Sequence, residues 1–325
     1  MRIGIDLGGT KIEAIVLGQQ GEIAFRKRVA TPQNNYQDLL YAIQNLIYDC
    51  ESAVENNCSV GIGIPGSLHP DSARVRNANL QILNGQTFAV DLEVLLNRPI
   101  RVSNDANCFA LSEACDGAAK GAQVVFGVIL GTGCGGGLVF HGKVWQGASG
   151  LAGEWGHNPL PAMDESDHPG VRCYCGRQAC IETFVSGTGL ARDYKLHTGH
   201  ALTAKQITAA AEAGEAQSQD AMMRLERRLA KALAAIINVL DPDCIVLGGG
   251  LSNCQRLYRN IPLLWSEYIF GGESKTKLMP AIHGDSSGVR GAAWLWPADG
   301  DLHPPQDADA SSFNVCQQES DDSLT

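Results

Sequence analysis

Residues 2–23 read RIGIDLGGTKIEAIVLGQQGEI, and residues 125–144 read VFGVILGTGCGGGLVFHGKV. Each stretch gives an apolar run, a turn that contains Gly and Thr, a second apolar run, a short polar turn and a third strand-like run. Short apolar runs bounded by such turns predict β-strands, so each stretch predicts a three-stranded meander. Because the same unit occurs twice at long range, the sequence indicates an internal duplication. We therefore expect an α/β protein of two lobes with a cleft between them.

The segments around the two meanders predict the rest of each lobe. Apolar residues at helical spacing indicate helices near 37–55, 106–114 and 217–240, and a short helix at VRGAAWLW. Further strands are expected at SVGIGIPG, IRVSND and CIVLGGG. We place an N-terminal lobe over residues 1–114 and a C-terminal lobe over residues 115–297.

The last part of the chain differs from the rest in charge. Residues 298–325 hold seven acidic side chains and neither Lys nor Arg, which predicts a disordered tail. The formal net charge of the chain is −10, and without this tail it is −10 + 7 = −3. A negative balance argues against nucleic acids and acidic membranes as partners.

Composition places the chain among globular proteins of enzyme size. It has 325 residues, of which 44% are apolar and 18% charged. No apolar run approaches the roughly 18 residues that a membrane span needs, and the start, MRIGIDLGGT, has no signal-peptide layout. We expect a cytoplasmic protein whose thiols stay reduced.

Glycine-rich turns in both meanders suit the binding of phosphate. The turns DLGGTK at 6–11 and GTGCGGG at 131–137 offer backbone N–H groups without side-chain bulk. Either turn alone is typical of an ordinary β-turn, but the pair, with Asp6 placed to organise Mg²⁺, predicts ATP held between the lobes. A third turn, at 247–250, would let the adenine lie on bare backbone. The expected nucleotide-binding residues are Gly4, Asp6, Gly8, Gly9, Thr10, Lys11, Thr132, Gly133, Cys134, Gly135, Gly248 and Gly249.

Three cysteines gather in RCYCGRQACIE at 172–182, whereas the other eight are scattered. Cys173, Cys175 and Cys180, together with His157 upstream, would complete the tetrahedral ligand set of a structural Zn²⁺, with no position left for water. His168 is a competing histidine, and a chance grouping of thiols is the alternative to a metal site. The spacing favours structural zinc.

Asp105 stands between the strand IRVSN and the helix ANCFALSEA. A phosphoryl-transfer enzyme needs a carboxylate that accepts the proton of the attacking hydroxyl. An aspartate at the start of a helix is also an ordinary N-cap. The residues by themselves leave both roles open.

Five segments in order, DLGGTK, NDANC, GTGCGGG, GEWGH and CYCGRQACIE, resemble the ROK family of bacterial sugar kinases and repressors over about residues 2–297. The resemblance implies a two-lobed actin-like ATPase fold of the ribonuclease H type, with a zinc-binding loop. NDANCFALSEA, GEWGHNPLP, CIETFVSGTG and HGDSSGVRGAAWLWP are most similar to bacterial fructokinases of the manno(fructo)kinase type. The N-acetylglucosamine kinases are the nearest competitor. Ala179 stands where the family motif usually has Gly, which puts the local turn geometry in question.

The resemblance also assigns roles to individual residues. It makes Asp105 the general base and implies a structural zinc at His157, Cys173, Cys175 and Cys180. The substrate-binding residues it implies are Gly66, Asn79, Asn104, Asp105, Glu154, His157 and Glu182. His157 would use for the sugar the ring nitrogen that zinc leaves over.

We therefore expect a homodimeric, ATP- and Mg²⁺-dependent hexose kinase that converts D-fructose to fructose 6-phosphate (EC 2.7.1.4). The first alternative is an N-acetylglucosamine kinase of the same family. A sugar-responsive ROK repressor is less expected, because such repressors carry a helix-turn-helix before the first glycine-rich turn, and here five residues precede Asp6.

Overall fold

The computed structural model describes residues 1–297, so the tail predicted for 298–325 lies outside the described residues. It contains two five-stranded sheets of the same topology. The first has the order β3-β2-β1-β4-β7, with β1 Arg2–Leu7, β2 Lys11–Leu17, β3 Ile23–Ala30, β4 Ser59–Ile64 and β7 Arg101–Asn104. The second has the order β10-β9-β8-β11-β12, with β8 Val124–Leu130, β9 Cys134–Phe140, β10 Lys143–Val144, β11 Cys244–Gly248 and β12 Lys277–Pro280.

Strand directions repeat as well as strand order. β1 pairs antiparallel with β2 and parallel with β4, and β8 pairs antiparallel with β9 and parallel with β11. This agreement confirms the predicted duplication of the meander. In each sheet the strand before the glycine-rich turn, β1 or β8, ends at the same edge as its parallel neighbour, β4 or β11. The carboxyl ends of parallel strands are where a ligand site is expected in an open α/β sheet.

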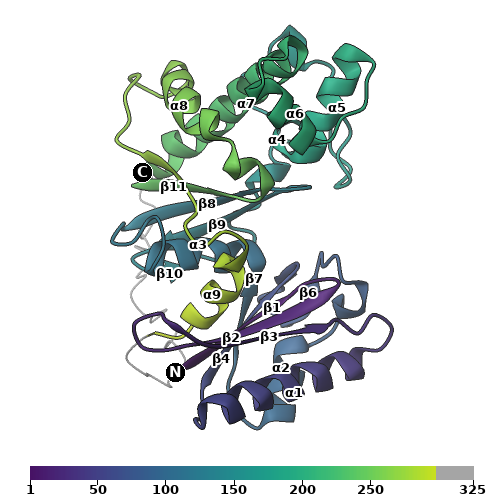
Figure 1. Cartoon of the computed structure of the whole chain (residues 1–325), viewed down its shortest axis with the longest axis vertical. Helices are drawn as coiled ribbons and strands as arrows, with labels where there is room; N and C mark the ends of the chain where they lie inside the picture. Colours follow the sequence, from purple (N-terminus) through teal and green to yellow (C-terminus); the bar gives the residue numbers. More distant parts are fainter. Residues whose placement is uncertain (298–325) are drawn as a thin grey trace, which may run out of the picture.

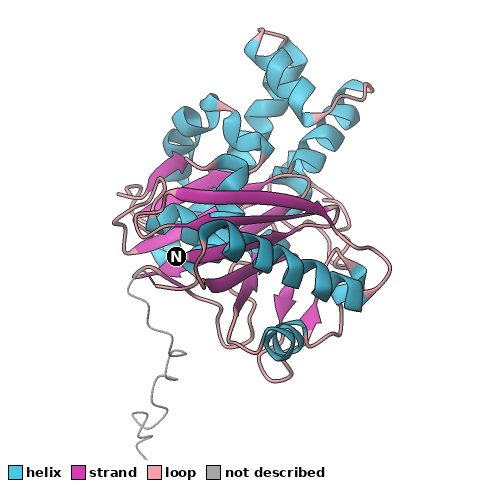
Figure 2. Cartoon of the chain, turned by 60° about the horizontal axis from the view of Figure 1, so that its bottom comes forward, coloured by secondary structure: helices cyan, strands magenta, loops and turns pink. Residues whose placement is uncertain are grey.

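Helices cover the outer face of each sheet (Figure 1). α1 (Tyr36–Val54) and α2 (Phe88–Leu96) lie below the first sheet, and Figure 2 brings this face forward. α4 (Glu182–Val185), α5 (Gly187–Thr198), α6 (Ala204–Glu212), α7 (Ala216–Leu240) and α8 (Gln255–Leu264) cover the second. α1 buries the expected apolar stripe and begins at Asn35, whose side chain accepts a hydrogen bond from the Gln37 amide. The helices predicted near 37–55 and 217–240 are thus confirmed.

Two helices lie between the sheets. α3 (Asp105–Cys115) packs on β8 and β9, and α9 (Ser287–Trp294) packs on β1 and β4, while the two helices contact each other. The helix that follows the first sheet in sequence therefore covers the second sheet, and the last helix returns to the first. The strands of the two sheets come from residues 2–104 and 124–280 respectively; a lobe boundary near residue 115 remains a prediction.

Glycines allow α9 to approach its neighbours backbone to backbone. A Cβ on Gly291 would lie 1.6 Å from the Cys108 carbonyl oxygen of α3, and a Cβ on Gly61 of β4 would lie 1.8 Å from the Ala292 oxygen. Gly4 of β1, which the sequence suggests as a nucleotide-binding residue, sits in the same contact, because its Cβ would lie 2.0 Å from the Val289 oxygen. The structure therefore gives Gly4 a packing role.

A buried carboxylate joins the same two helices. Glu113 of α3 is fully buried, and its Oε1 accepts a hydrogen bond from the Ser287 hydroxyl at 2.8 Å. The same carboxylate accepts bonds from the backbone amides of Ile282, His283 and Ala118. These donors satisfy the buried carboxyl group, so Glu113 has a structural role.

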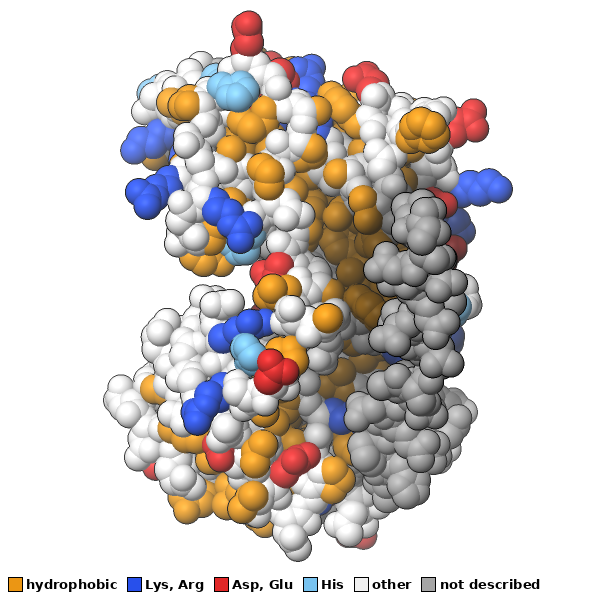
Figure 3. Space-filling view, turned by 180° about the vertical axis from the view of Figure 1, so that it is seen from behind, with side chains coloured by type: hydrophobic (Ala, Val, Ile, Leu, Met, Phe, Trp, Pro, Cys, Tyr) orange, Lys and Arg blue, Asp and Glu red, His pale blue; other side chains and the backbone are white. Residues whose placement is uncertain are grey.

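Among residues 1–297, no helix combines the length and apolarity that crossing a membrane requires. The surface is hollowed between the two lobes, at the left edge of the view from behind in Figure 3.

We predict that Gly291→Ala lowers the free energy of unfolding by about 3 kcal/mol. Helix propensity alone would favour Ala by about 1 kcal/mol, but the added methyl group meets backbone that cannot move without separating α9 from α3. Urea unfolding measures the change. Gly250→Ala is the matched control, since nothing lies within 4 Å of its added Cβ. A stabilised Gly291→Ala variant would contradict the prediction.

Candidate active site and zinc cluster

Asp105 is the first residue of α3, directly after β7. The N-cap of α3 is Asn104, whose Oδ1 accepts a hydrogen bond from the Ala106 amide at 2.9 Å, while its Nδ2 donates to the Gly66 carbonyl at 2.8 Å. Asp105 Oδ1 also accepts from the Ala106 amide, at 2.7 Å. Because Asn104 performs the capping, Asp105 is available for another role.

Four acidic side chains, Asp6, Glu13, Asp105 and Glu154, gather at this edge. Burial raises the pKa of Asp105, and the charge of Glu154 raises it further, against the hydrogen bond from Ala106. Burial, then the charges of Asp105 and Glu13, raise the pKa of Asp6 to about 6. Asp6 at the end of β1 and Asp105 at the end of β7 are therefore close in space, although about a hundred residues separate them.

Gly66 and Asn79 lie beside this group. Gly66 has a φ of 96°, and an added Cβ would lie 2.5 Å from the Arg76 oxygen and 2.8 Å from the Ala78 amide. The loop after β6 (Val75–Arg76) therefore packs directly on Gly66, and Asn79 is exposed in it. Gly66 thus contacts Asn104 through its carbonyl oxygen, and the loop that carries Asn79 packs against Gly66.

The glycine-rich turns face this edge from both lobes. In the first, the Gly8 amide donates to the Lys11 carbonyl at 3.0 Å, and Gly9, Thr10 and Lys11 are exposed. In the second, the Gly131 amide donates to the Gly133 carbonyl at 3.1 Å. The residues Thr132, Gly133, Cys134 and Gly135 follow on this second turn and the start of β9.

The third turn adjoins the second. Gly249 has a φ of 78°, and its added Cβ would lie 2.6 Å from the Leu130 oxygen, while that of Gly248 would lie 2.5 Å from the Phe109 ring. Both positions need glycine for close packing. The carboxyl ends of β8 and β11 therefore lie together, as an adenine site on bare backbone requires.

Glu182 connects the second glycine-rich turn with the cysteine segment. It begins α4, and its Oε2 accepts a hydrogen bond from the Cys134 amide at 3.0 Å. Its Oε1 lies 3.7 Å from the sulfur of Cys173. One carboxylate thus contacts a predicted nucleotide loop and a predicted metal ligand.

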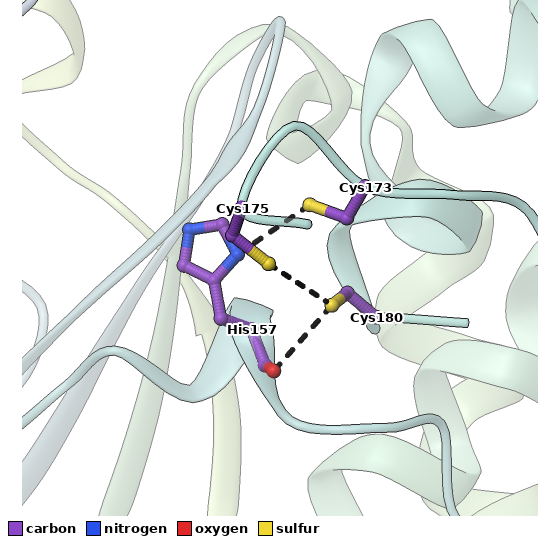
Figure 4. Close-up of side chains that lie close together, drawn as sticks. All are labelled: His157, Cys173, Cys175 and Cys180. Atoms are coloured by element: carbon purple, nitrogen blue, oxygen red, sulfur yellow. Dashed lines mark hydrogen bonds between the residues drawn. The ribbon is translucent and has the colours of Figure 1, made fainter. Parts of the chain in front are cut away.

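His157, Cys173, Cys175 and Cys180 form a compact group (Figure 4). Their ligand atoms all lie within 4.8 Å of one another; Cys173 Sγ is 3.6 Å from His157 Nδ1, and Cys175 Sγ is 3.6 Å from Cys180 Sγ. Ligands about 2.3 Å from a tetrahedral Zn²⁺ stand about 3.8 Å apart, so the spacing fits that metal. His168 is not part of this group.

Ala179 occupies the position at which the turn geometry was in question. It has a left-handed φ of 59°, the conformation for which glycine is the usual residue. Its amide donates to the Val171 carbonyl and its carbonyl accepts from the Leu160 amide, both at 2.9 Å, and its methyl group is buried in the core of the second lobe. These contacts offset the strain of roughly 1–2 kcal/mol that a left-handed alanine bears.

A buried ion network holds the segment between His157 and Cys173. Lys231 of α7 donates to Asp164 and Asp167, each at 2.9 Å, and Arg228 donates to Asp167 at 2.7 Å and to Asp193 at 2.6 Å. Although burial opposes it, hydrogen bonds from Arg228 and Lys231 lower the pKa of Asp167. Sequence reasoning missed this network, because its members are spread over more than sixty residues.

Tyr174, between two of the cysteines, is a further residue that sequence reasoning missed. Its hydroxyl lies 3.0 Å from Nε2 of His157, and the two rings meet edge to face. Desolvation of the hydroxyl, followed by the negative charges of Glu182, Cys173 and Glu154, raises its pKa to about 12. Its place inside the cysteine motif was the only sequence signal.

Comparisons with known proteins identify the family of the chain. The model of the ROK family matches residues 2–299, and the chain belongs to that family. An N-acetyl-D-glucosamine kinase of Pectobacterium atrosepticum is 42% identical over 299 residues, which is 91% of this chain and 98% of the relative. One from Vibrio cholerae is 41% identical over 302 residues, covering 91% and 99%.

Solved structures of ROK kinases have the same fold as this chain. The ROK hexokinase of Thermus thermophilus superposes with a TM-score of 0.81 at 28% identity, over 90% of this chain and 97% of that one. A ROK glucokinase from Streptomyces griseus, solved with glucose and AMPPNP, has a TM-score of 0.72 at 28% identity, over 90% and 98%. The expected two-lobed, actin-like ATPase fold and the resemblance to ROK sugar kinases are confirmed.

The prediction of a fructokinase (EC 2.7.1.4) is wrong. The relatives at 40–42% identity over most of the chain are N-acetyl-D-glucosamine kinases. The prediction depended on the resemblance of segments that flank the site, GEWGHNPLP and HGDSSGVRGAAWLWP, to bacterial fructokinases. It did not depend on a pocket shape, so it had no physical basis for choosing between the two sugars.

We predict about one tightly bound Zn²⁺ per chain, lost in Cys175→Ser, with thermal stability and sugar affinity falling together. Removing one of four ligands opens the site, and metal binding energy contributes to folding. Elemental analysis and thermal unfolding measure the effect. Cys115→Ser, outside the cluster, is the control and keeps its zinc. Purified, fully active protein without metal would disprove the site.

We predict that Asp6→Asn stabilises the nucleotide-free protein by up to about 3 kcal/mol at pH 7.5. Well below its ordinary pKa of 3.8, Asp6 is protonated in both states and contributes nothing; above its folded pKa of about 6 it is charged in both, and the folded state bears the whole cost. The gain should therefore fall to under about 1 kcal/mol at pH 4. Urea unfolding at both pH values tests this, and an equal gain at both would contradict it.

Proposed function

We propose that the protein is an ATP-dependent N-acetylhexosamine kinase that transfers the γ-phosphate to the 6-hydroxyl of N-acetyl-D-glucosamine. The observation that carries the proposal is the 42% identity to an N-acetyl-D-glucosamine kinase over 98% of that relative's length. The full-length match includes all the segments that form the site, and nothing in the geometry favours fructose over this sugar.

Mg²⁺-ATP would occupy the edge between the lobes. The exposed turn at Gly9–Lys11 and the turn at Gly131–Gly133 would bind the phosphates through backbone amides. Asp6, whose carboxylate lies near Asp105, would organise Mg²⁺, and the cation would offset the negative charge of Asp105 that contributes to the raised pKa of Asp6. The glucokinase from Streptomyces griseus, which has the same fold and was solved with glucose and AMPPNP, supports the use of ATP and a sugar as substrates.

Asp105 would act as the general base. Its raised pKa makes it a better proton acceptor than an ordinary aspartate, and its position at the start of α3 needs no capping role. It would accept the proton of the 6-hydroxyl as the oxygen attacks the γ-phosphate in line.

The remaining polar groups would hold the sugar. Asn104, Gly66 and Asn79 approach from the first lobe, and Glu154, His157 and Glu182 approach from the second. Carboxylates suit a polyol because they accept hydrogen bonds and cannot donate. The zinc would have no chemical step; it would fix His157 relative to the cysteine segment.

A sugar panel tests the proposed substrate. In a coupled ADP-release assay with saturating Mg²⁺-ATP, kcat/KM for N-acetylglucosamine should exceed that for fructose, mannose and glucose by at least about a hundredfold. Sites built around a polar substituent discriminate strongly against analogues that lack it. Faster phosphorylation of an unsubstituted hexose would overturn the proposal.

Asp105→Asn tests the base. We predict a fall in kcat of at least about a hundredfold, with fold and nucleotide affinity preserved, because Asn104 still caps α3. In the wild type, kcat/KM should fall as the pH drops through the raised pKa of Asp105, and the residual activity of the variant should lack this decline. Asp38→Asn, on α1, is the control. Near wild-type turnover would mean that the base lies elsewhere.

A further inference from the structure

Tyr174 differs from its neighbours in exposure. It stands between Cys173 and Cys175, two residues of the zinc cluster, and Cys173 is buried. The side chain of Tyr174 is nevertheless 84% exposed. Its ring meets the ring of His157 edge to face, and most of the remaining surface of the side chain is open to solvent.

The hydroxyl of Tyr174 is directed at one nitrogen of His157. Nδ1 of His157 faces the thiols, 3.6 Å from Cys173 Sγ, and Nε2 points away from them (Figure 4). The Tyr174 oxygen lies 3.0 Å from Nε2, with the ring centroids 5.2 Å apart and the planes at 86°. The contact is a hydrogen bond of ordinary length.

The phenol also lies near the carboxylates expected to bind the sugar. Glu182 contacts Cys173, the residue before Tyr174, and the Cys134 amide. The charges of Glu182 and Glu154 both act on the Tyr174 hydroxyl. The hydroxyl therefore lies on His157, beside a carboxylate that contacts the same cysteine segment.

Nε2 of His157 can serve only one partner well. A histidine that ligates zinc through Nδ1 keeps its proton on Nε2, which then offers a single N–H donor. With that tautomer, the Tyr174 oxygen is the acceptor of the 3.0 Å hydrogen bond to Nε2. A sugar oxygen that reaches His157 needs the same donor.

We propose, on the basis of the function proposed above, that the Tyr174 hydroxyl takes the place of one sugar hydroxyl on Nε2 of His157 and is displaced when the sugar binds. Tyr174 is thus a residue that sets the sugar affinity of the site. When the sugar binds, His157 loses its hydrogen bond to Tyr174 and forms one to the sugar. The net binding free energy is therefore smaller than it would be if the His157 donor were free.

Tyr174→Phe removes the competing oxygen and keeps the ring. Freeing one hydrogen bond of ordinary strength should lower the Kd for N-acetylglucosamine about two- to tenfold. Isothermal titration calorimetry on the zinc-loaded full-length protein, without nucleotide, measures this. Tyr41→Phe, an exposed tyrosine of α1, is the matched control and should leave the Kd unchanged. Elemental analysis should show the same zinc content in all three proteins.

Deoxy analogues identify the hydroxyl that replaces Tyr174. Among 1-deoxy, 3-deoxy and 4-deoxy N-acetylglucosamine, one should bind wild type and Tyr174→Phe equally, because it lacks the oxygen that takes the His157 proton. The other two analogues should bind Tyr174→Phe about two- to tenfold more tightly than they bind wild type. Equal gains for all three analogues would overturn the proposal.

Unchanged or weaker binding by Tyr174→Phe would also overturn it; weaker binding would mean that the hydroxyl contacts the sugar directly. Failure of the proposed function is distinguishable, because wild type would then not bind N-acetylglucosamine. In that case the Kd values of wild type and Tyr174→Phe are compared for the hexose of the panel that wild type does bind. Tighter binding by the variant would again support the proposal, and unchanged or weaker binding would again overturn it.

Discussion

The contact of α9 with α3 and the first sheet is the constraint on which the rest of the structure depends. Backbone lies against backbone at Gly291, Gly61 and Gly4, where a single methyl group would enter a neighbouring chain segment. Glu113, fully buried, ties the start of α9 to α3. Since α3 packs on the second sheet and α9 on the first, this contact sets the distance between the lobes. The predicted base, Asp105, begins α3, so its position follows from the same contact.

The cysteine segment is held in two independent ways. The His157–Cys180 group provides a site that fits zinc, and the ion network of Arg228 and Lys231 holds the connecting segment on α7. Breaking a buried ion pair on one side costs about 3–5 kcal/mol, because the other charge loses its partner. Both anchors limit the freedom of the segment that carries His157 and Glu182, two of the residues proposed to bind the sugar.

Asp6 and Asp105 lie close together and buried, an arrangement that lowers the stability of the folded protein. Burial raises the pKa of both Asp6 and Asp105. The charge of Asp105 adds to the rise at Asp6, and that of Glu154 adds to the rise at Asp105, so the ionisation of both groups works against folding at neutral pH. A bound cation and a sugar hydroxyl would relieve this cost. A site that is unfavourable when empty and favourable when filled is what a phosphoryl-transfer enzyme requires.

The sequence by itself determined the duplicated meander, because a strand–turn–strand pattern is local and its apolar runs are short. It also determined the four members of the cysteine–histidine cluster, since three thiols within eight residues and a nearby histidine match the ligand set of a tetrahedral metal. Only the tertiary structure decided which sheet α3 and α9 cover, that Asn104 rather than Asp105 caps α3, and that Tyr174 meets His157. Each of these depends on contacts between residues far apart in the chain or on a side-chain rotamer. A local pattern carries no information about either, because the energy that fixes them comes from partners that only folding brings together.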